Sequence, residues 1–208
     1  FMTKIKKVLE TVCFNCGKIK LDESNPQFVD ATRIREPKAR FNAVWRLCKA
    51  KGVCEQDSVT EDADFEGATV QPPEKKRMHG GCGNKQPQIR REGLKLWGNW
   101  KADRDSGEEN PQGEKRVISP GEILNIFKHI TDEEIQKMGL NKDYARPEWM
   151  ILTVLAVPPP PVRPSIAVDG MAGGARGEDD LTYKLGDIIR ANGNVRQAEA
   201  NGSPAHVV

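Results

Sequence analysis

Five unevenly spaced cysteines constrain this chain more than any other feature. Cys13 and Cys16 form a close pair with two residues between them, whereas Cys54 and Cys82 stand singly near glycines. A two-residue gap lets one tight turn present two thiolates to one metal ion, and structural zinc takes four ligands in a tetrahedron. Glycine lets the backbone turn sharply around such an ion. The pattern predicts a structural Zn²⁺ site with the ligands Cys13, Cys16, Cys54 and Cys82.

The spacing also leaves other interpretations open, because 27 residues separate Cys54 from Cys82 and the second pair is therefore not close. A redox dithiol at Cys13 and Cys16, or simply buried thiols, would fit the same residues. A redox pair should lie at the strand-to-helix turn of a βαβ unit, yet the stretch before this pair has a helical pattern. His79, three residues before Cys82, could substitute as a ligand, but the favoured interpretation is an exposed loop histidine.

The fifth cysteine, Cys48, has a different context. It continues an apolar row at helical spacing that also contains Phe41, Val44 and Trp45. Pro37 suits the first turn of a helix over residues 38–51, and Gly52 suits its end. We expect Cys48 to be a small buried hydrophobe rather than a ligand.

Composition excludes several classes of protein. The chain has 208 residues with 32 basic and 30 acidic side chains, so a net charge of +2 does not by itself indicate a nucleic-acid partner. No apolar run approaches the roughly 20 residues of a membrane helix, and no signal sequence is present. An odd number of cysteines without such a signal favours a reducing compartment and metal binding over disulfides. Because the chain starts at Phe1, we expect a fragment of a longer protein.

The remaining pattern predicts an α+β fold of short helices, short antiparallel strands and long loops. Residues 55–80 are polar without periodicity, which predicts a disordered insertion. The other expected elements are a helix over 1–12, two strands joined by a turn at Glu92-Gly93, a strand at 116–118, helices capped by Ser119 and Thr131, a strand over 150–157, a polyproline rod over 158–161, and a helix from Asp179-Asp180 with Leu181, Leu185, Ile188 and Ile189 buried.

No motif for catalysis occurs in the sequence. The three histidines, at 79, 129 and 206, are far apart and lack a neighbouring nucleophile, and neither a P-loop nor a G-x-G-x-x-G motif is present. The acids at 178–180 suit the start of a helix, where they favour the dipole, better than a magnesium site.

Seven segments carry a family resemblance. In chain order they resemble the N-terminal region of the largest subunit of eukaryotic DNA-directed RNA polymerase II, and together they cover nearly the whole chain. The four prolines before Val162 are more similar to polymerase II than to polymerase I or III. The segments are Cys-Phe-Asn-Cys (13–16), Arg-Phe-Asn-Ala-Val-Trp (40–45), Gly-Cys-Gly-Asn-Lys-Gln-Pro (81–87), Glu-Ile-Leu-Asn-Ile-Phe (122–127), Arg-Pro-Glu-Trp-Met-Ile-Leu-Thr (146–153), Val-Pro-Pro-Pro-Pro-Val-Arg-Pro-Ser (157–165) and Arg-Gly-Glu-Asp-Asp-Leu-Thr (176–182).

The resemblance implies a role in transcription as part of the clamp, a mobile module that closes over DNA and the DNA–RNA hybrid. Residues 1–101 would form its zinc-binding region, and residues 102–208 the remainder, with a lid-like loop at 162–180 that helps to separate nascent RNA from the template. In that family, cysteines matching the four predicted ligands hold zinc. The Mg²⁺ of the nucleotidyltransferase reaction is bound by the full-length subunit outside this fragment, so no catalytic residue is expected here.

The implied partners are template DNA, nascent RNA and other polymerase II subunits, in the nucleus and without a membrane. Candidate nucleic-acid contacts are Lys85, Arg90, Arg91, Arg163 and Arg176. Phosphate attraction is one explanation for the basic residues after Cys82, and a solvated surface explains them equally well. Two alternatives to a polymerase segment stay open: a stand-alone zinc-binding interaction module and a redox protein that uses Cys13 and Cys16.

Overall fold

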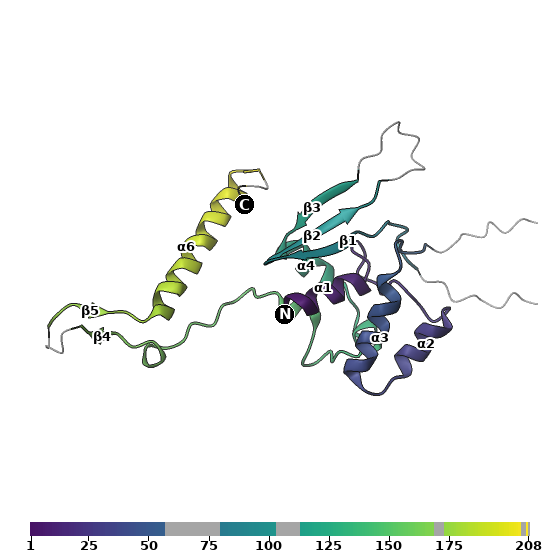
Figure 1. Ribbon diagram of the computed structural model, residues 1–208, viewed down its shortest axis with the longest axis horizontal. Helices are drawn as coiled ribbons and strands as arrows, with labels where there is room; N and C mark the ends of the chain where they lie inside the picture. The colour runs from purple at the N-terminus through teal and green to yellow at the C-terminus, as the bar shows by residue number, and fades with distance from the viewer. Residues whose placement is uncertain (57–79, 103–112, 169–172, 205–206, 208) are drawn as a thin grey trace, which may run out of the picture. The chain divides into compact units, whose positions relative to one another are not determined.

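The computed structural model describes residues 1–56, 80–102, 113–168, 173–204 and 207. The chain divides into two compact units, Phe1–Leu152 and Thr153–Val208 (Figure 1). Most of the predicted insertion, residues 57–79, lies outside the described residues together with His79, and so do residues 103–112 and 169–172. Helices and short antiparallel strands occur in both units, which confirms the predicted α+β class.

The first unit is built from five helices, one 3₁₀ helix and a three-stranded sheet within the described residues. Its elements are α1 (Met2–Thr11), α2 (Pro26–Arg33), α3 (Pro37–Lys49), β1 (Gln88–Glu92), β2 (Lys95–Trp100), β3 (Glu114–Ile118), α4 (Pro120–Lys128), α5 (Asp132–Lys137) and η1 (Pro147–Met150). Helix α1 packs against α3 and β1, and α2 packs against α3. Apolar residues at helical spacing on α1 therefore face both neighbours and begin the core, which includes Ile5, Val8, Leu9, Phe41, Val44, Ile89, Leu96, Ile118 and Phe127.

The sheet has the order β1-β2-β3, and both pairings are antiparallel. Leu96 of β2 pairs with Ile118 of β3, and both side chains are buried on the face that covers the core. Glu92 pairs with Lys95, so the turn consists of Gly93 and Leu94. The predicted turn at Glu92-Gly93 was therefore wrong by one residue, because the positive φ of 58° at Gly93 falls inside the turn rather than at its end.

Capping side chains fix where α4 and α5 begin. The Ser119 hydroxyl accepts a hydrogen bond from the Glu122 N–H at 3.2 Å, and the Glu122 carboxylate accepts one from the Ser119 N–H at 3.0 Å. Thr131 and Glu134 form the same reciprocal box at the start of α5. Both predicted capping boxes are thus confirmed. Helix α2 was not predicted, although Asn25 caps it and Pro26 opens it in the standard manner.

Two predicted features near residue 150 differ from the structure. Residues 150–157 do not form a strand: η1 ends at Met150, and the following apolar residues are exposed, with Val154 at 82%. A strand needs a neighbouring strand to satisfy its backbone groups, and none in the described chain pairs with this run. The polyproline rod is also interrupted, since Pro160–Val162 forms the 3₁₀ helix η2.

The second unit contains a short hairpin and one long helix. Strands β4 (Ile166–Ala167) and β5 (Arg176–Gly177) pair antiparallel, and α6 (Asp180–Ala200) follows with Asp179 as its cap. No described residue of α6 is buried, and Ile189 is 69% exposed. The predicted buried face formed by Leu181, Leu185, Ile188 and Ile189 was therefore wrong, because no described element of this unit forms a second layer over it. No described helix is long and apolar enough to cross a membrane.

Candidate metal centre

The first two cysteines lie in a tight loop at the end of α1. The chain turns back after Cys13, whose backbone N–H donates to Lys18 at 2.7 Å, while the Gly17 N–H donates to the Cys13 carbonyl at 3.0 Å. Gly17 has a φ of +76°, and a Cβ there would lie 2.8 Å from the Cβ of His129. This loop therefore needs glycine both for its backbone conformation and for its packing against α4.

The other two cysteines come from a pair of extended segments that face each other. The Cys54 N–H donates to the Asn84 carbonyl at 3.0 Å, and the Gly83 N–H donates to the Cys54 carbonyl at 2.8 Å. A further bond joins the Gln86 N–H to the Gly52 carbonyl at 2.7 Å. Residues far apart in the sequence are thus held side by side by backbone pairing.

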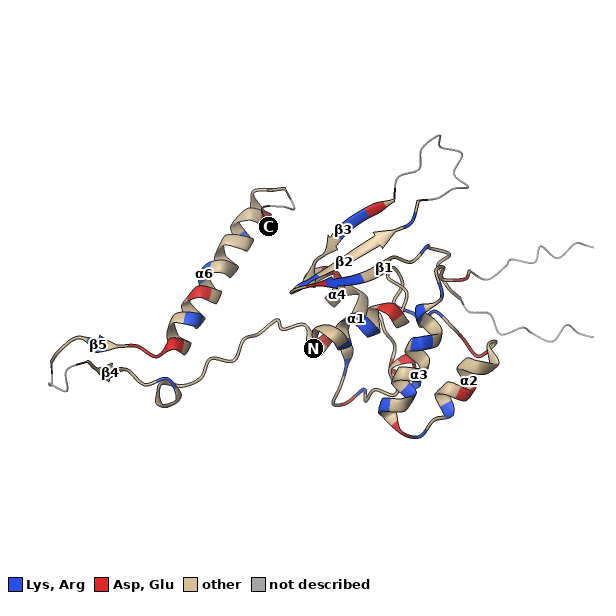
Figure 2. Cartoon of the chain, viewed as in Figure 1, with Lys and Arg blue, Asp and Glu red and all other residues tan. Residues whose placement is uncertain are grey.

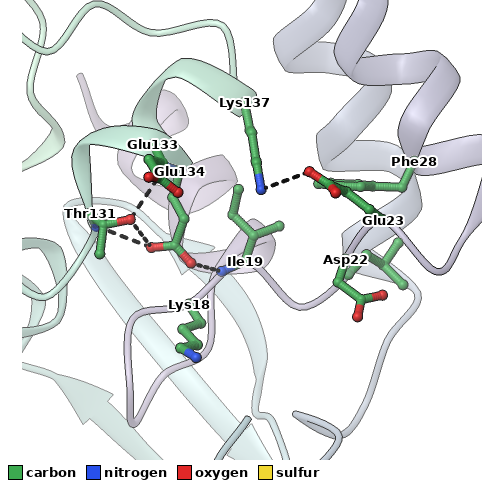
Figure 3. Close-up of a pocket in the computed structure, with 10 residues that line it drawn as sticks. Lys18, Ile19, Asp22, Glu23, Phe28, Thr131, Glu133, Glu134 and Lys137 are labelled. Atoms are coloured by element: carbon green, nitrogen blue, oxygen red, sulfur yellow. Dashed lines mark hydrogen bonds and ion pairs between the residues drawn. The ribbon is translucent and has the colours of Figure 1, made fainter. Parts of the chain in front are cut away.

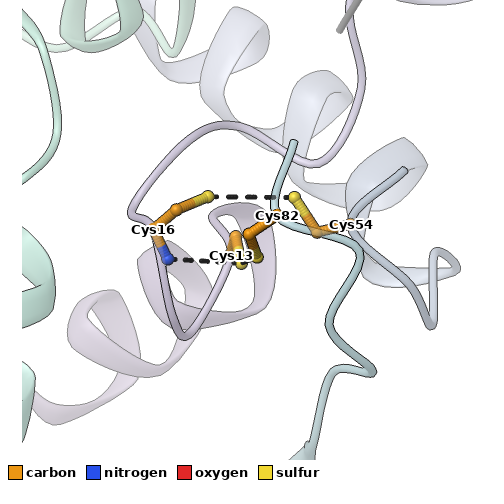
Figure 4. A group of neighbouring side chains, drawn as sticks. All are labelled: Cys13, Cys16, Cys54 and Cys82. Carbon is orange, nitrogen blue, oxygen red and sulfur yellow. Dashed lines mark hydrogen bonds between the residues drawn. The ribbon is translucent and has the colours of Figure 1, made fainter. Parts of the chain in front are cut away.

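All four sulfur atoms point toward one another (Figure 4). The Sγ atoms of Cys13, Cys16, Cys54 and Cys82 lie within 4.8 Å of one another, with Cys13 and Cys82 3.5 Å apart and Cys16 and Cys54 3.8 Å apart. A tetrahedral zinc ion with Zn–S bonds of about 2.3 Å places its sulfurs about 3.8 Å from each other. The spacing therefore fits a single metal ion, and it is the one group of this kind among the described residues.

Amide groups surround the sulfurs with hydrogen-bond donors. The side chain of Gln86 donates to the sulfur of Cys13 at 3.2 Å, and the side chain of Asn84 donates to the sulfur of Cys82 at 3.2 Å. Backbone N–H groups of Asn15 and Cys16 also approach the Cys13 sulfur, at 3.4 and 3.5 Å. Such donors stabilise thiolates, which are the metal-binding form of cysteine. Sequence reasoning gave neither amide side chain a role, although both lie close to Cys82 within the family-like segment 81–87.

Without a metal, the thiols of Cys16, Cys54 and Cys82 differ in their pKa. Burial alone would raise the pKa of Cys82, but hydrogen bonds from the backbone and side chain of Asn84, and from Cys13 and Cys16, lower it to about 7. Burial raises the pKa of Cys16 and Cys54. Thiolates crowded together repel one another. A cation at their centre would neutralise this negative charge, which the surrounding loops do not do by themselves.

One buried cation lies near these thiols. Lys20 is 5% exposed, and its Nζ donates to the Lys51 carbonyl at 3.3 Å. Burial lowers the pKa of Lys20, whereas the nearby Cys48, Glu10, Cys13 and Cys54 act in the opposite direction. Its ammonium group therefore offsets part of the negative charge that a set of four thiolates would carry.

Cys48 does not join the group. It lies on α3 with no exposed surface, and burial raises its pKa to about 12. The prediction that Cys48 is a buried hydrophobe is confirmed.

A pocket of about 460 Å³ lies between the segment after the first cysteine loop and α5 (Figure 3). Its polar groups are used within the fold: Glu134 accepts from the Ile19 N–H at 3.0 Å and completes the cap of α5, and Lys137 pairs with Glu23 at 3.3 Å. These bonds hold the segment after the cysteine loop against α5. The residues that line the pocket include no nucleophile with an adjacent base.

The candidate nucleic-acid residues fall into the two units. Lys85, Arg90 and Arg91 are exposed in the first unit, where the guanidinium of Arg91 donates to the Gly93 carbonyl and to Thr3. In the second unit, Arg163 donates to the Pro158 carbonyl at 2.8 Å and to Thr182 at 3.3 Å. Arg176 donates to the hydroxyl and the carbonyl of Ser165. The two arginines of the second unit thus already join its segments to one another.

Four cysteines that converge from three segments of an α+β unit define a candidate metal centre of the structural kind, because four protein ligands leave no open position for a substrate. The model of the family described as RNA polymerase Rpb1, domain 1, matches residues 1–208. The chain belongs to this family and is an N-terminal segment of the largest subunit of an RNA polymerase.

Proposed function

We propose that this chain is the zinc-stabilised clamp segment of the largest subunit of RNA polymerase II, in which Cys13, Cys16, Cys54 and Cys82 hold one structural Zn²⁺. The observation that carries this proposal is the convergence of the four sulfurs within 4.8 Å. The four-proline run before Val162 supports the assignment to polymerase II. As part of that enzyme, the chain acts in the nucleus with template DNA, nascent RNA and the other subunits.

The role of the metal follows from what surrounds it. The loops that carry the cysteines pair through a few backbone hydrogen bonds, whereas most residues of the buried apolar cluster lie in the helices and the sheet. Structural zinc contributes folding free energy on the order of 10 kcal/mol in small zinc peptides. One ion therefore makes the loops and the helices α1 and α3 behave as one stiff body. A module that swings over DNA needs such internal rigidity.

The second unit suits the proposed lid. Its hairpin of β4 and β5 is short, and its apolar helix face on α6 is exposed rather than packed. We assign residues 162–180 to the lid, which separates RNA from the template. The catalytic Mg²⁺ belongs to another part of the subunit, so this segment guides nucleic acid and does not itself form phosphodiester bonds.

Metal analysis of the purified chain tests the proposal. We expect one zinc per chain, and we expect single Cys→Ser changes at positions 13, 16, 54 and 82 to release or weaken it. Cys48→Ser is the matched control and should retain zinc. Zinc loss from Cys48→Ser together with full retention in Cys54→Ser would contradict the proposed ligand set. A reversible disulfide between Cys13 and Cys16 in a zinc-free chain would favour the redox alternative.

A further inference from the structure

The two helices that pack against each other in the first unit carry a strongly biased charge. Together α1 and α3 hold seven basic side chains and one acidic side chain, whereas the whole chain holds 32 and 30 (Figure 2). The basic residues are Lys4, Lys6, Lys7, Lys38, Arg40, Arg46 and Lys49, and the acid is Glu10. Such local bias in an otherwise balanced chain creates a positive potential that attracts anions.

Four of these lysines form a connected row, which we call the lysine stripe: Lys4, Lys7, Lys38 and Lys49. Aromatic rings of α3 hold three of them in place. The Nζ of Lys4 lies 3.8 Å from the centroid of the Phe41 ring, and the Nζ atoms of Lys7 and Lys49 lie 4.2 and 5.2 Å from that of Trp45. Burial and the nearby positive charges of Lys7 and Lys38 lower the pKa of Lys4.

The stripe has no neutralising acid of its own. Glu10 is 7% exposed and is already engaged, because it accepts a hydrogen bond from the Trp45 indole at 2.7 Å and pairs with Lys6 at 3.4 Å. No carboxylate in the described part of the chain forms an ion pair with any lysine of the stripe. Like charges crowded in this way are costly, and an external polyanion relieves that cost.

We propose that the lysine stripe binds the phosphodiester backbone of a nucleic acid. This inference rests on the proposed function, since nucleic acid is the polyanion that an RNA polymerase handles. From Lys38 to Lys49 the stripe extends for about 16 Å along α3 at 1.5 Å per residue, and one strand of duplex DNA presents roughly five phosphates over that length. Ammonium groups act as point charges on phosphates and read no bases, so the binding is independent of sequence.

Aromatic support makes the stripe more than a solvated helix face. A lysine held over a ring has already lost part of its rotamer freedom, so less entropy is lost when its ammonium meets a phosphate. The hydrogen bond from Lys7 to Asn42, at 2.9 Å, further restrains Lys7 between the two helices.

Fluorescence anisotropy of the full, zinc-loaded chain with labelled nucleic acids tests the proposal. The probes are a single-stranded RNA, a single-stranded DNA of the same sequence and the matching duplex, each titrated between 50 and 200 mM salt. The variant is Lys4→Gln/Lys7→Gln/Lys49→Gln. We expect weaker binding irrespective of base sequence and a plot of log K against log salt that is shallower by about 2 for single strands, since each lost phosphate contact removes about 0.7. The three probes separate RNA from DNA as the source of the phosphates.

The matched control replaces three lysines elsewhere in the same unit: Lys128→Gln/Lys137→Gln/Lys142→Gln. Lys137 and Lys142 already pair with Glu23 and Asp132, at 3.3 and 3.8 Å, so we expect a smaller change in slope. The charge-preserving variant Lys4→Arg/Lys7→Arg/Lys49→Arg should retain the binding. Equal losses in the stripe and control variants, absence of nucleic-acid binding, or binding of poly-glutamate in its place would overturn the proposal. Zinc analysis of the same sample shows independently whether the four cysteines hold the metal. Failure of the nucleic-acid proposal can therefore be distinguished from failure of the metal assignment.

Discussion

The side-chain nitrogen of Gln86 lies 3.2 Å from the sulfur of Cys13, and the side-chain oxygen of the same residue accepts the Phe14 N–H at 2.7 Å. Gln86 also donates to the Asn84 carbonyl at 2.8 Å. One side chain therefore connects the loop of the first two cysteines with the segment that follows Cys82. It holds both in register and supplies a donor to a thiolate that would bind the metal.

Gln86→Glu separates these two roles, because it keeps an oxygen for the Phe14 N–H and replaces the donor to Cys13 by a negative oxygen. We expect zinc to transfer to a chromogenic chelator about 10- to 100-fold faster, the usual effect of losing a residue that supports a ligand. Gln88→Glu places the same charge two residues along the strand, where the side chain is exposed, and should change the rate little. Equal rates for both variants and the native chain would show that the amide donor is unimportant.

Gly17→Ala tests the loop of the first two cysteines. The positive φ costs on the order of 1 to 3 kcal/mol for a residue other than glycine, and the new methyl group would collide with His129. We expect a lower free energy of unfolding in urea and weaker zinc retention. Gly52→Ala is the control, since nothing lies within 4 Å of its added Cβ and its φ is not positive. A Gly17→Ala variant as stable as the Gly52→Ala variant would contradict the described packing.

Alkylation of the chain after zinc removal by a chelator tests the acidities of the cysteine thiols. At pH 8, a thiol with a pKa of about 7 is mostly thiolate, so Cys82 should react first with iodoacetamide. Cys48 and Cys54 should react last, because both are buried and burial raises the pKa of both thiols, that of Cys48 to about 12. Peptide mapping by mass spectrometry gives the order, and early modification of Cys48 would show that α3 opens or that Cys48 is exposed. Zinc should protect the four clustered thiols, because a metal-bound thiolate is shielded.

The proposed lid makes a prediction about the complete polymerase. Shortening the hairpin by removing residues within 169–175 should leave nucleotide addition largely intact, because we propose that the catalytic Mg²⁺ is bound by another part of the subunit. Displacement of RNA from the template should be impaired, and the DNA–RNA hybrid should lengthen when it is mapped by nuclease protection. A hybrid of unchanged length would count against the assignment of residues 162–180 to a lid.

Features with local chemical causes were predictable from the sequence. Ser119 and Thr131 were identified as caps because the partner glutamates stand three residues on, and Cys48 was placed in the core by the apolar period of α3. The α+β class followed from the same local signals.

Features that depend on distant partners were not predictable in the same way. An apolar run such as residues 150–157 becomes a strand only beside another strand, and the apolar face of α6 is buried only beneath another layer. Gln86 belongs to no periodic pattern that predicts its bond to Cys13, since that bond joins residues 73 apart in the sequence. Composition likewise concealed the lysine stripe, because acids elsewhere in the chain balance its charge.

X-ray absorption at the zinc edge of the purified chain tests the central claim most directly. The account predicts one zinc surrounded by four sulfur atoms at about 2.3 Å, with the same first shell in Cys48→Ser. A shell with nitrogen or oxygen in place of one or more sulfurs, or a folded chain that holds no zinc, would contradict it.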